Sequence, residues 1–189
     1  MPPDEHRPLR IAILGCGAIA RRHAATLSRF PGVQVGFASR DLRRAEAYAA
    51  RHGGFRAYPS YTAAIEDRGV DATLIATPPS DHFCLTLESL RAGKPALVEK
   101  PAFTDTAEAD RIIAASKNTG QQVLVLENYG YKPVTRVLRN LIAADDVGEV
   151  RHIRLNALKW QDSWGWRQDP EICGGGALWA PDPSSCCSD

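Results

Sequence analysis

A glycine-rich turn between a short apolar run and a helical pattern constrains the fold most. Residues 10–14 are mainly apolar and end directly at Gly15, which is typical of a strand buried on both faces of a parallel sheet. In residues 18–29 apolar side chains recur at helical spacing. Strand, turn and helix in immediate succession predict the opening of a βαβ unit.

The same alternation continues along the chain. Further strands are predicted at residues 33–39, 72–76, 96–98 and 122–126, and helices at residues 42–52, 61–67, 81–92, 107–119 and 134–144. Alternation at this pace indicates crossover connections with helices on both faces of a parallel sheet. The predicted fold class is therefore α/β, a doubly wound Rossmann sheet.

The pattern changes after Gly148. Residues 150–158 alternate between apolar and polar side chains, as a half-buried strand does. We therefore predict a Rossmann domain over residues 1–130. Residues 131–189 are predicted to begin a second α/β domain that is incomplete.

Length and charge exclude several classes of protein. The 189 residues carry 23 Lys and Arg against 22 Asp and Glu, so no basic field favours nucleic acid or an anionic membrane. No apolar run approaches the roughly 20 residues that span a bilayer, and the polar start lacks the apolar stretch of a signal peptide. We expect a cytoplasmic protein that binds small molecules and neither nucleic acid nor membranes. The five cysteines lack zinc spacing, so no metal is expected.

The turn Gly15-Cys-Gly17-Ala18-Ile19-Ala20 fits the pattern G-x-G-x-x-G/A. Gly15 permits the tight turn, Gly17 lets the backbone approach a pyrophosphate, and small Ala20 lets the helix pack against the strand. The N–H groups at the start of the helix then face the phosphates. FAD, S-adenosylmethionine and a plain turn are the alternatives. The strand–turn–helix setting favours a dinucleotide, with Gly15, Gly17, Ala18 and Ile19 as contacts.

The end of the second predicted strand bears on the choice between NAD and NADP. An acidic residue there would bind the ribose hydroxyls of NAD, but this chain has Ser39 and Arg40. A hydroxyl and a guanidinium favour a 2′-phosphate through charge-assisted hydrogen bonds, so NADP is preferred over NAD. Arg43 and Arg44 can add charge beside the adenine. For each of these two, a solvated helix face is the better interpretation.

Two more predicted strands end in polar residues at the same edge of the sheet. One leads into Thr77 and His82, and the other into Glu99, Lys100 and Pro101. A lysine at this edge is suited to donate a proton or hydrogen bond to a substrate oxygen, while Glu99 can orient it or bind the cofactor ribose. A lysine followed by proline is also a common surface turn.

Together these motifs resemble the glucose-fructose oxidoreductase, inositol dehydrogenase and rhizopine catabolism (Gfo/Idh/MocA) family. The resemblance extends from about Leu9 to Trp179. It rests on the glycine turn, Ala38-Ser39-Arg40, Ala76-Thr77-Pro78-Pro79 with His82, Gly93-Lys94-Pro95, Glu99-Lys100-Pro101, Glu127-Asn128-Tyr129, Pro133, Gly148-Glu149-Val150, Trp166-Arg167 and Gly174-Gly175-Gly176-Ala177-Leu178.

The resemblance implies reversible hydride transfer between NAD(P) and a hydroxyl-bearing carbon of a sugar, polyol or similar small alcohol. It also implies a C-terminal α/β domain and, for intact relatives, homo-oligomers. By motif, Lys100 is the catalytic lysine. The cofactor contacts implied by the resemblance are Thr77, Pro78, His82, Glu99, Lys100, Asn128, Trp166 and Arg167.

The end of the chain departs from the family pattern. In the family the glycine stretch leads into a helix whose acidic residue and histidine complete a proton relay with the lysine. Here residues 179–189 contain two prolines and a run of serines and cysteines, which cannot continue that helix. We expect a C-terminally truncated chain, with a frameshift as the hypothesis for its cause. The alternative function is a non-catalytic fragment that binds NADP without turnover. A methyltransferase is disfavoured because Ser39 and Arg40 offer no carboxylate to a ribose.

Overall fold

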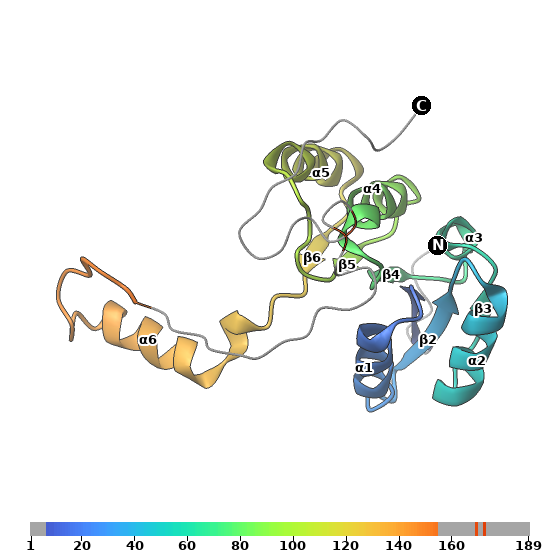
Figure 1. Ribbon diagram of the computed structural model, residues 1–189, viewed down its shortest axis with the longest axis horizontal. Coiled ribbons are helices and arrows are strands. Elements are labelled where there is room, and N and C mark those ends of the chain that lie inside the picture. Colours follow the sequence, from blue (N-terminus) through green and yellow to red (C-terminus); the bar gives the residue numbers. More distant parts are fainter. Residues whose placement is uncertain (1–6, 155–168, 170–171, 173–189) are drawn as a thin grey trace.

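A single parallel sheet organises the part of the chain that the computed structural model describes, residues 7–154, 169 and 172 (Figure 1). Its strands are β1 (Leu9–Leu14), β2 (Val33–Ala38), β3 (Ala57–Tyr58), β4 (Ala72–Ile75), β5 (Ala96–Val98) and β6 (Val123–Val125). Their order in space is β3-β2-β1-β4-β5-β6, and every neighbouring pair is parallel. This order defines the doubly wound Rossmann sheet and confirms the predicted fold class.

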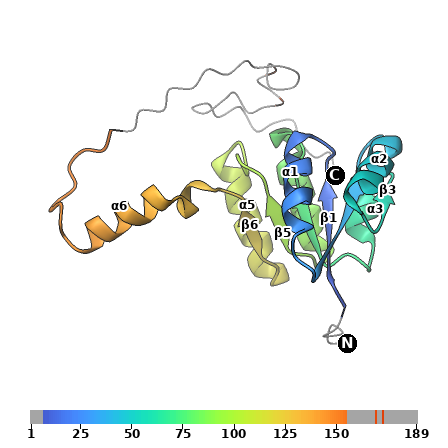
Figure 2. The ribbon, with the colours of Figure 1, turned by 90° about the horizontal axis from the view of Figure 1, so that it is seen from below.

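Helices connect the strands and cover both faces of the sheet (Figure 2). They are α1 (Ala18–Leu27), α2 (Leu42–His52), α3 (Tyr61–Glu66), α4 (His82–Arg91), α5 (Thr106–Thr119) and α6 (Pro133–Ala143). Two short 3₁₀ turns, η1 (Pro79–Asp81) and η2 (Tyr129–Tyr131), precede α4 and α6. The helices therefore fall close to the residues predicted from hydrophobic spacing.

The core follows from the alternation of side chains along β1. Ile11 and Ile13 face one side of the sheet and pack with Ala20 and Ala24 of α1. Leu14 faces the other side and belongs to the cluster that includes α3. Small alanines let α1 approach the sheet closely, and each fully buried isoleucine stabilises the fold by about 1.5–3 kcal/mol.

Local capping sets the ends of α2 and α5. Asp41 accepts the N–H of Arg43 at the start of α2, and Asp105 caps α5 in the same way. Gly53 and Gly120 end these helices with φ of 66° and 70°, the left-handed conformation that glycine adopts most readily.

Two short elements differ from the predictions. Strand β3 was not predicted, because two residues are too few to show a period; it is defined by pairing with Phe37 and Ala38 of β2. Within the strand predicted over residues 150–158, the described residues 150–154 form no strand. Residues 155–158 lie outside the described part, and the predicted domain boundary at residue 130 stays a prediction.

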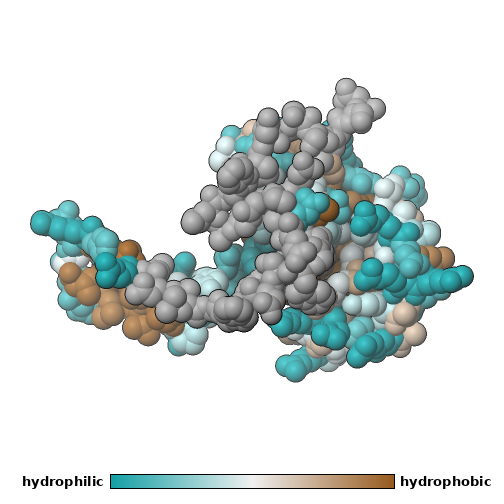
Figure 3. Space-filling model, viewed as in Figure 1, coloured by the Kyte–Doolittle hydropathy of each residue, from teal (hydrophilic) through white to brown (hydrophobic). Residues whose placement is uncertain are grey.

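Helix α6 extends away from the sheet (Figure 1) and carries an apolar face. Val134, Val137, Leu138 and Ile142 are each about half exposed, and this face is brown in the space-filling view (Figure 3). The spacing of three to four residues places these side chains on one side of the helix. Such a face is typical of a helix that packs against another element.

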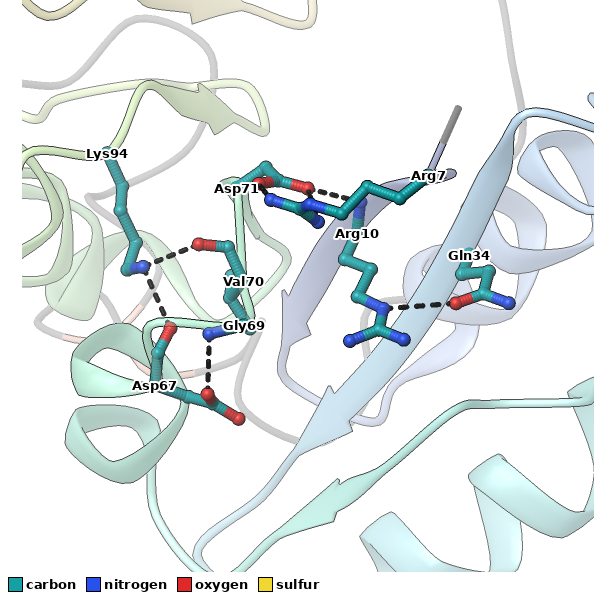
Figure 4. A network of polar contacts seen from close by, with 8 residues as sticks. All are labelled: Arg7, Arg10, Gln34, Asp67, Gly69, Val70, Asp71 and Lys94. Atoms are coloured by element: carbon teal, nitrogen blue, oxygen red, sulfur yellow. Dashed lines mark hydrogen bonds and ion pairs between the residues drawn. The ribbon is translucent and has the colours of Figure 1, made fainter. Parts of the chain in front are cut away.

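A polar network ties the amino edge of the sheet together (Figure 4). The ammonium group of Lys94, which is only 7% exposed, donates to the carbonyl oxygens of Asp67 and Val70. Asp71 accepts the backbone N–H of Arg10 at 2.8 Å and pairs with the guanidinium of Arg7. Lys94 of the Gly-Lys-Pro motif therefore holds the loop between α3 and β4, at the edge opposite the glycine turn.

Among the residues that the structure describes, none of the helices is both long enough and apolar enough to cross a membrane.

Candidate cofactor site

The glycine turn lies at the carboxyl end of β1, beside the segment that follows β4. Gly15 has φ of 106°, and a Cβ there would lie 2.7 Å from the carbonyl oxygen of Ala76. Glycine is therefore required both by the backbone conformation and by the close approach of the neighbouring strand. A Cβ at Gly17 would meet no atom of the described residues within 4 Å. Packing among the described residues therefore does not require glycine at this position, and the space beside Gly17 is open to a ligand.

Helix α1 begins directly after this turn without a side-chain cap. Its N-cap residue is Gly17, and its first turn contains no acidic residue. The first N–H groups of a helix have no partner within the helix and carry a partial positive charge. An anion is the group best suited to satisfy them.

The end of β2 lies next to the turn, since the N–H of Gly15 donates to the carbonyl oxygen of Ala38 at 3.0 Å. The side chain of Ser39 is buried, and its Oγ accepts the N–H of Asp41. Arg40 is exposed. Burial raises the pKa of Tyr61, and the guanidinium of Arg40 beside it opposes that rise. Ser39 and Arg40 are thus placed at the carboxyl edge, as the sequence predicted.

Two residues of α2 contact the turn from the side. The Nη2 of Arg44 donates to the carbonyl oxygen of Cys16 at 2.9 Å. The hydroxyl of Tyr48 donates to the carbonyl oxygen of Gly17 at 3.1 Å. Arg44 is exposed, as a solvated helix face predicts, but its guanidinium also bonds the turn. Tyr48 lies on the apolar side of the predicted helix, and its contact with the turn was not predicted. The spacing of four residues between them is the only sequence signal that could have linked them.

Thr77, directly after the residue that contacts Gly15, carries a buried hydroxyl without a partner. Its side chain is 7% exposed, and Oγ1 makes no hydrogen bond to the described residues. Buried polar atoms are nearly always paired, because leaving one unpaired costs about 1–3 kcal/mol. An unpaired hydroxyl directly after β4, next to the turn that ends β1, therefore indicates a place for a polar ligand.

His82 connects two loops at this edge. Its ring is 1% exposed, with Nε2 lying 3.0 Å from the carbonyl oxygen of Thr77 and Nδ1 lying 2.9 Å from that of Pro101. Both ring nitrogens therefore face the main chain. In this arrangement His82 holds the loop after β4 to the loop after β5.

Glu99 and Lys100 follow β5. The carboxylate of Glu99 accepts hydrogen bonds from Nε2 of His23 at 2.7 Å and from the N–H of Lys100 at 3.1 Å. Burial raises the pKa of Glu99, but these two hydrogen bonds and the neighbouring positive charges lower it more, so the net pKa lies below its usual value. Lys100 is exposed and is followed by a cis peptide bond to Pro101.

His23 is a site residue that sequence reasoning missed. Its position on the apolar side of the first predicted helix suggested packing only. Glu99 lies 76 positions away, and no local pattern relates the two residues.

The remaining predicted contacts are Asn128, Pro78, Trp166 and Arg167. Asn128 is exposed and precedes η2, after the last strand. Pro78 is half-buried beside Thr77. Trp166 and Arg167 lie outside the described residues. Within the described part, no cluster of three or more His, Cys, Asp or Glu side chains is arranged to hold a metal ion.

The strand order and the glycine turn at its switch point define a dinucleotide-binding Rossmann domain. Residues 9–127 match the model of the oxidoreductase family with an NAD-binding Rossmann fold, the Gfo/Idh/MocA family. The chain belongs to this family, which confirms the resemblance inferred from its motifs.

Similar proteins of this kind are reductases and dehydrogenases. The dTDP-3,4-didehydro-2,6-dideoxy-alpha-D-glucose 3-reductase of Actinomadura kijaniata is 33% identical over 153 residues, which cover 79% of this chain and 45% of the reductase. The trans-1,2-dihydrobenzene-1,2-diol dehydrogenase of Sus scrofa is 30% identical over 78% of this chain and 45% of its own length. This chain thus spans less than half the length of these relatives.

Two solved structures of similar proteins are also oxidoreductases. A 3-ketoreductase from Actinomadura kijaniata, in complex with NADP and TDP-benzene, matches with a TM-score of 0.70 and 31% identity over 77% of this chain and 45% of its own. The myo-inositol 2-dehydrogenase from Lactobacillus plantarum matches with a TM-score of 0.69 and 26% identity over 76% of this chain and 43% of its own.

Proposed function

We propose that this chain binds a nicotinamide dinucleotide at the carboxyl edge of its sheet, with NADP preferred over NAD. We further propose that the protein transfers hydride between the nicotinamide and a hydroxyl-bearing carbon of a sugar, polyol or similar small alcohol. The observation that carries the proposal is the unpaired, buried hydroxyl of Thr77 beside the glycine turn.

The residues at this edge fit a dinucleotide. Gly17 leaves open space, α1 offers uncapped N–H groups to the pyrophosphate, and Thr77 offers a hydroxyl further along the crevice. When bound, the nicotinamide supplies the hydride acceptor or donor. The chain itself would bind and orient the dinucleotide and handle the proton of the substrate.

The preference for NADP rests on charge at the end of β2. Ser39 and Arg40 occupy the position where a carboxylate would favour NAD, and a 2′-phosphate is attracted by the guanidinium. The 3-ketoreductase of Actinomadura kijaniata was solved with NADP, which supports the same choice.

Lys100 is proposed as the group that moves the proton. It follows β5 at the carboxyl edge, and its own N–H is held by the Glu99 carboxylate. An exposed lysine at this position is suited to donate a proton to a substrate oxygen next to the nicotinamide as the ammonium, and to accept one from it as the neutral amine. Glu99 then acts by fixing the backbone at Lys100.

The substrate class rests on the relatives rather than on the described residues. Two of the relatives are a deoxysugar-nucleotide reductase and an inositol dehydrogenase, so a sugar-like or polyol substrate is proposed. The non-catalytic alternative gains no support from these comparisons. A second domain from about residue 131, homo-oligomers of intact relatives and a cytoplasmic location stay predictions.

Titration of the full chain with NADPH and NADH tests the proposal, followed through the fluorescence of the reduced nicotinamide. We expect saturable binding, tighter for NADPH. With NADP⁺ supplied as the hydride acceptor, we expect oxidation of a polyol or sugar with formation of NADPH, and Lys100→Met is expected to abolish this turnover while the variant still binds the dinucleotide. Failure to bind either dinucleotide would overturn the proposal.

A further inference from the structure

Helix α2 holds the glycine turn by two successive carbonyl oxygens. Arg44 donates to Cys16 at 2.9 Å, and Tyr48 donates to Gly17 at 3.1 Å. These acceptors are the second and third residues of the turn, so both contacts lie where the backbone would approach a pyrophosphate. Spacing of four residues places both donors on one side of α2. We call these two contacts the carbonyl clamp.

A carbonyl oxygen held in place also orients the N–H of the next residue. The peptide unit is planar and trans, so its C=O and its N–H point in opposite directions. Because the carbonyl of Cys16 points toward α2, the N–H of Gly17 points away from α2. The carbonyl of Gly17 has two donors, the hydroxyl of Tyr48 and the N–H of Arg21 at 3.2 Å, which is the first hydrogen bond of α1. The N–H of Ala18 therefore points out from the N-terminal end of α1, and Tyr48 adds a second donor that holds it so.

The sheet order tells where these N–H groups face. Helix α2 joins β2 to β3, and both of these strands lie on one side of β1. Strand β4 and Thr77 lie on the other side, across the crevice at the switch point. We infer that N–H groups that point away from α2 face the side of β4 and Thr77.

Tyr48 is itself held in place by packing, whereas Arg44 is exposed on α2. The ring of Tyr48 packs edge-on against the buried ring of Phe37, with 5.7 Å between ring centroids, and lies 5.6 Å from the ring of His52. The first turn of α2 is capped by Asp41. Through Tyr48 the clamp thus connects the turn to the core.

We propose that Arg44 and Tyr48 are positioning residues that orient the N–H groups of Gly17 and Ala18 toward the cofactor pyrophosphate. The inference rests on the proposed function, since it assumes that a dinucleotide binds here. The effect on NAD and NADP affinity distinguishes the clamp from a contact with the 2′-phosphate. The pyrophosphate is common to NAD and NADP, so loss of the clamp weakens both equally, whereas loss of a contact to the 2′-phosphate weakens NADP alone.

The test compares three single variants of the full chain, Arg44→Gln, Tyr48→Phe and Arg43→Gln. Tyr48→Phe removes only the hydroxyl and keeps the ring against Phe37. Arg43→Gln makes the same charge change as Arg44→Gln, one residue away at an exposed position of the same helix. Dissociation constants for NADPH and NADH are measured for each, with circular dichroism as the check on folding.

We expect Arg44→Gln and Tyr48→Phe each to weaken both dinucleotides by about fivefold, the effect of one net hydrogen bond. Arg43→Gln is expected to bind like the wild type. If all three variants bound NADPH and NADH as tightly as the wild type does, the inference would be overturned. A loss confined to NADPH in Arg44→Gln would also overturn it, because it would assign Arg44 to the 2′-phosphate.

Amide NMR of the unliganded chain gives a readout that needs no cofactor. The signals of Gly17 and Ala18 are expected to shift in Tyr48→Phe and to stay in place in Arg43→Gln. Wild-type protein that binds neither dinucleotide defeats the proposed function. Unmoved Gly17 and Ala18 signals in Tyr48→Phe defeat the clamp alone.

Discussion

Nε2 of His23 lies 2.7 Å from Oε1 of Glu99, which joins helix α1 to the loop after β5 across 76 positions of sequence. Both side chains are mostly buried, at 23% and 12% exposed. The helix that begins at the phosphate-binding turn and the loop that carries Lys100 are therefore tied to each other. The residues proposed for phosphate binding and for proton transfer therefore belong to one connected unit.

Replacing His23 tests this connection. In His23→Ala the Glu99 carboxylate loses one of its two hydrogen bonds while staying largely buried, so we expect a loss of about 1–3 kcal/mol in the free energy of unfolding. His23→Gln retains an N–H donor and should recover part of that loss. Urea denaturation of both variants checks the prediction, which fails if the alanine variant is as stable as the wild type.

Removing the Thr77 hydroxyl should separate stability from binding. In Thr77→Val an unpaired buried hydroxyl is replaced by a methyl group of similar size, so the unliganded protein is expected to be equally stable or up to about 1 kcal/mol more stable. Affinity for NADPH is expected to fall by about fivefold, because the hydroxyl that would hydrogen-bond to the ligand is removed.

Thr73→Val is the control, because the buried hydroxyl of Thr73 donates to Ser89 at 2.9 Å and lies within β4. We expect this variant to be less stable and to bind NADPH normally. The same thermal melts and titrations serve both variants. Unchanged NADPH affinity in Thr77→Val would remove the observation on which the proposed site depends.

Lys94 should matter for stability and not for binding. In Lys94→Met the buried carbonyl oxygens of Asp67 and Val70 lose their donor, so a loss of about 2–3 kcal/mol in the free energy of unfolding is expected. The network (Figure 4) lies at the amino edge of the sheet, whereas the glycine turn follows the carboxyl end of β1. NADPH affinity at a temperature where the variant is folded should match the wild type, and a large change would place Lys94 in the site.

Acid should weaken the same network. The hydrogen bond from the Gly69 N–H lowers the pKa of Asp67; burial raises that of Asp71, but Arg7 and the Arg10 N–H lower it more. A carboxyl whose pKa is lowered in the folded state contributes stability above its unfolded pKa of 3.8. That stability is lost as the pH falls through the lower folded value.

Asp71→Asn removes this titration at one position. We expect the free energy of unfolding of the wild type to fall below about pH 4, and to fall less steeply in the variant. Guanidinium denaturation over a series of pH values measures both slopes. Identical slopes would show that Asp71 has the same pKa in both states.

Local patterns were enough to predict most of the fold. The run that ends at Gly15, and the helix spacing after it, predicted the switch-point turn, because each depends on neighbours in sequence. The two-residue strand β3 could not be predicted, since its pairing with Phe37 and Ala38 is a tertiary contact.

Some residues of the candidate site could likewise be predicted from local sequence, and others could not. Gly17, Arg40 and Lys100 follow strand ends, which parallel topology brings to one edge. The contacts of His23 with Glu99 and of Arg44 with Cys16 join different elements. Only the packing of α1 and α2 on the sheet reveals them, because residue type alone does not distinguish a packing histidine or a solvated arginine from a partner.

A crystal structure of the chain grown with NADP tests the central claim most directly. The account predicts the pyrophosphate against the N–H groups of Gly17 and Ala18, the 2′-phosphate beside Arg40 and the nicotinamide within reach of Lys100. A dinucleotide bound elsewhere on the protein, or a turn that faces only solvent at saturating NADP, would contradict it.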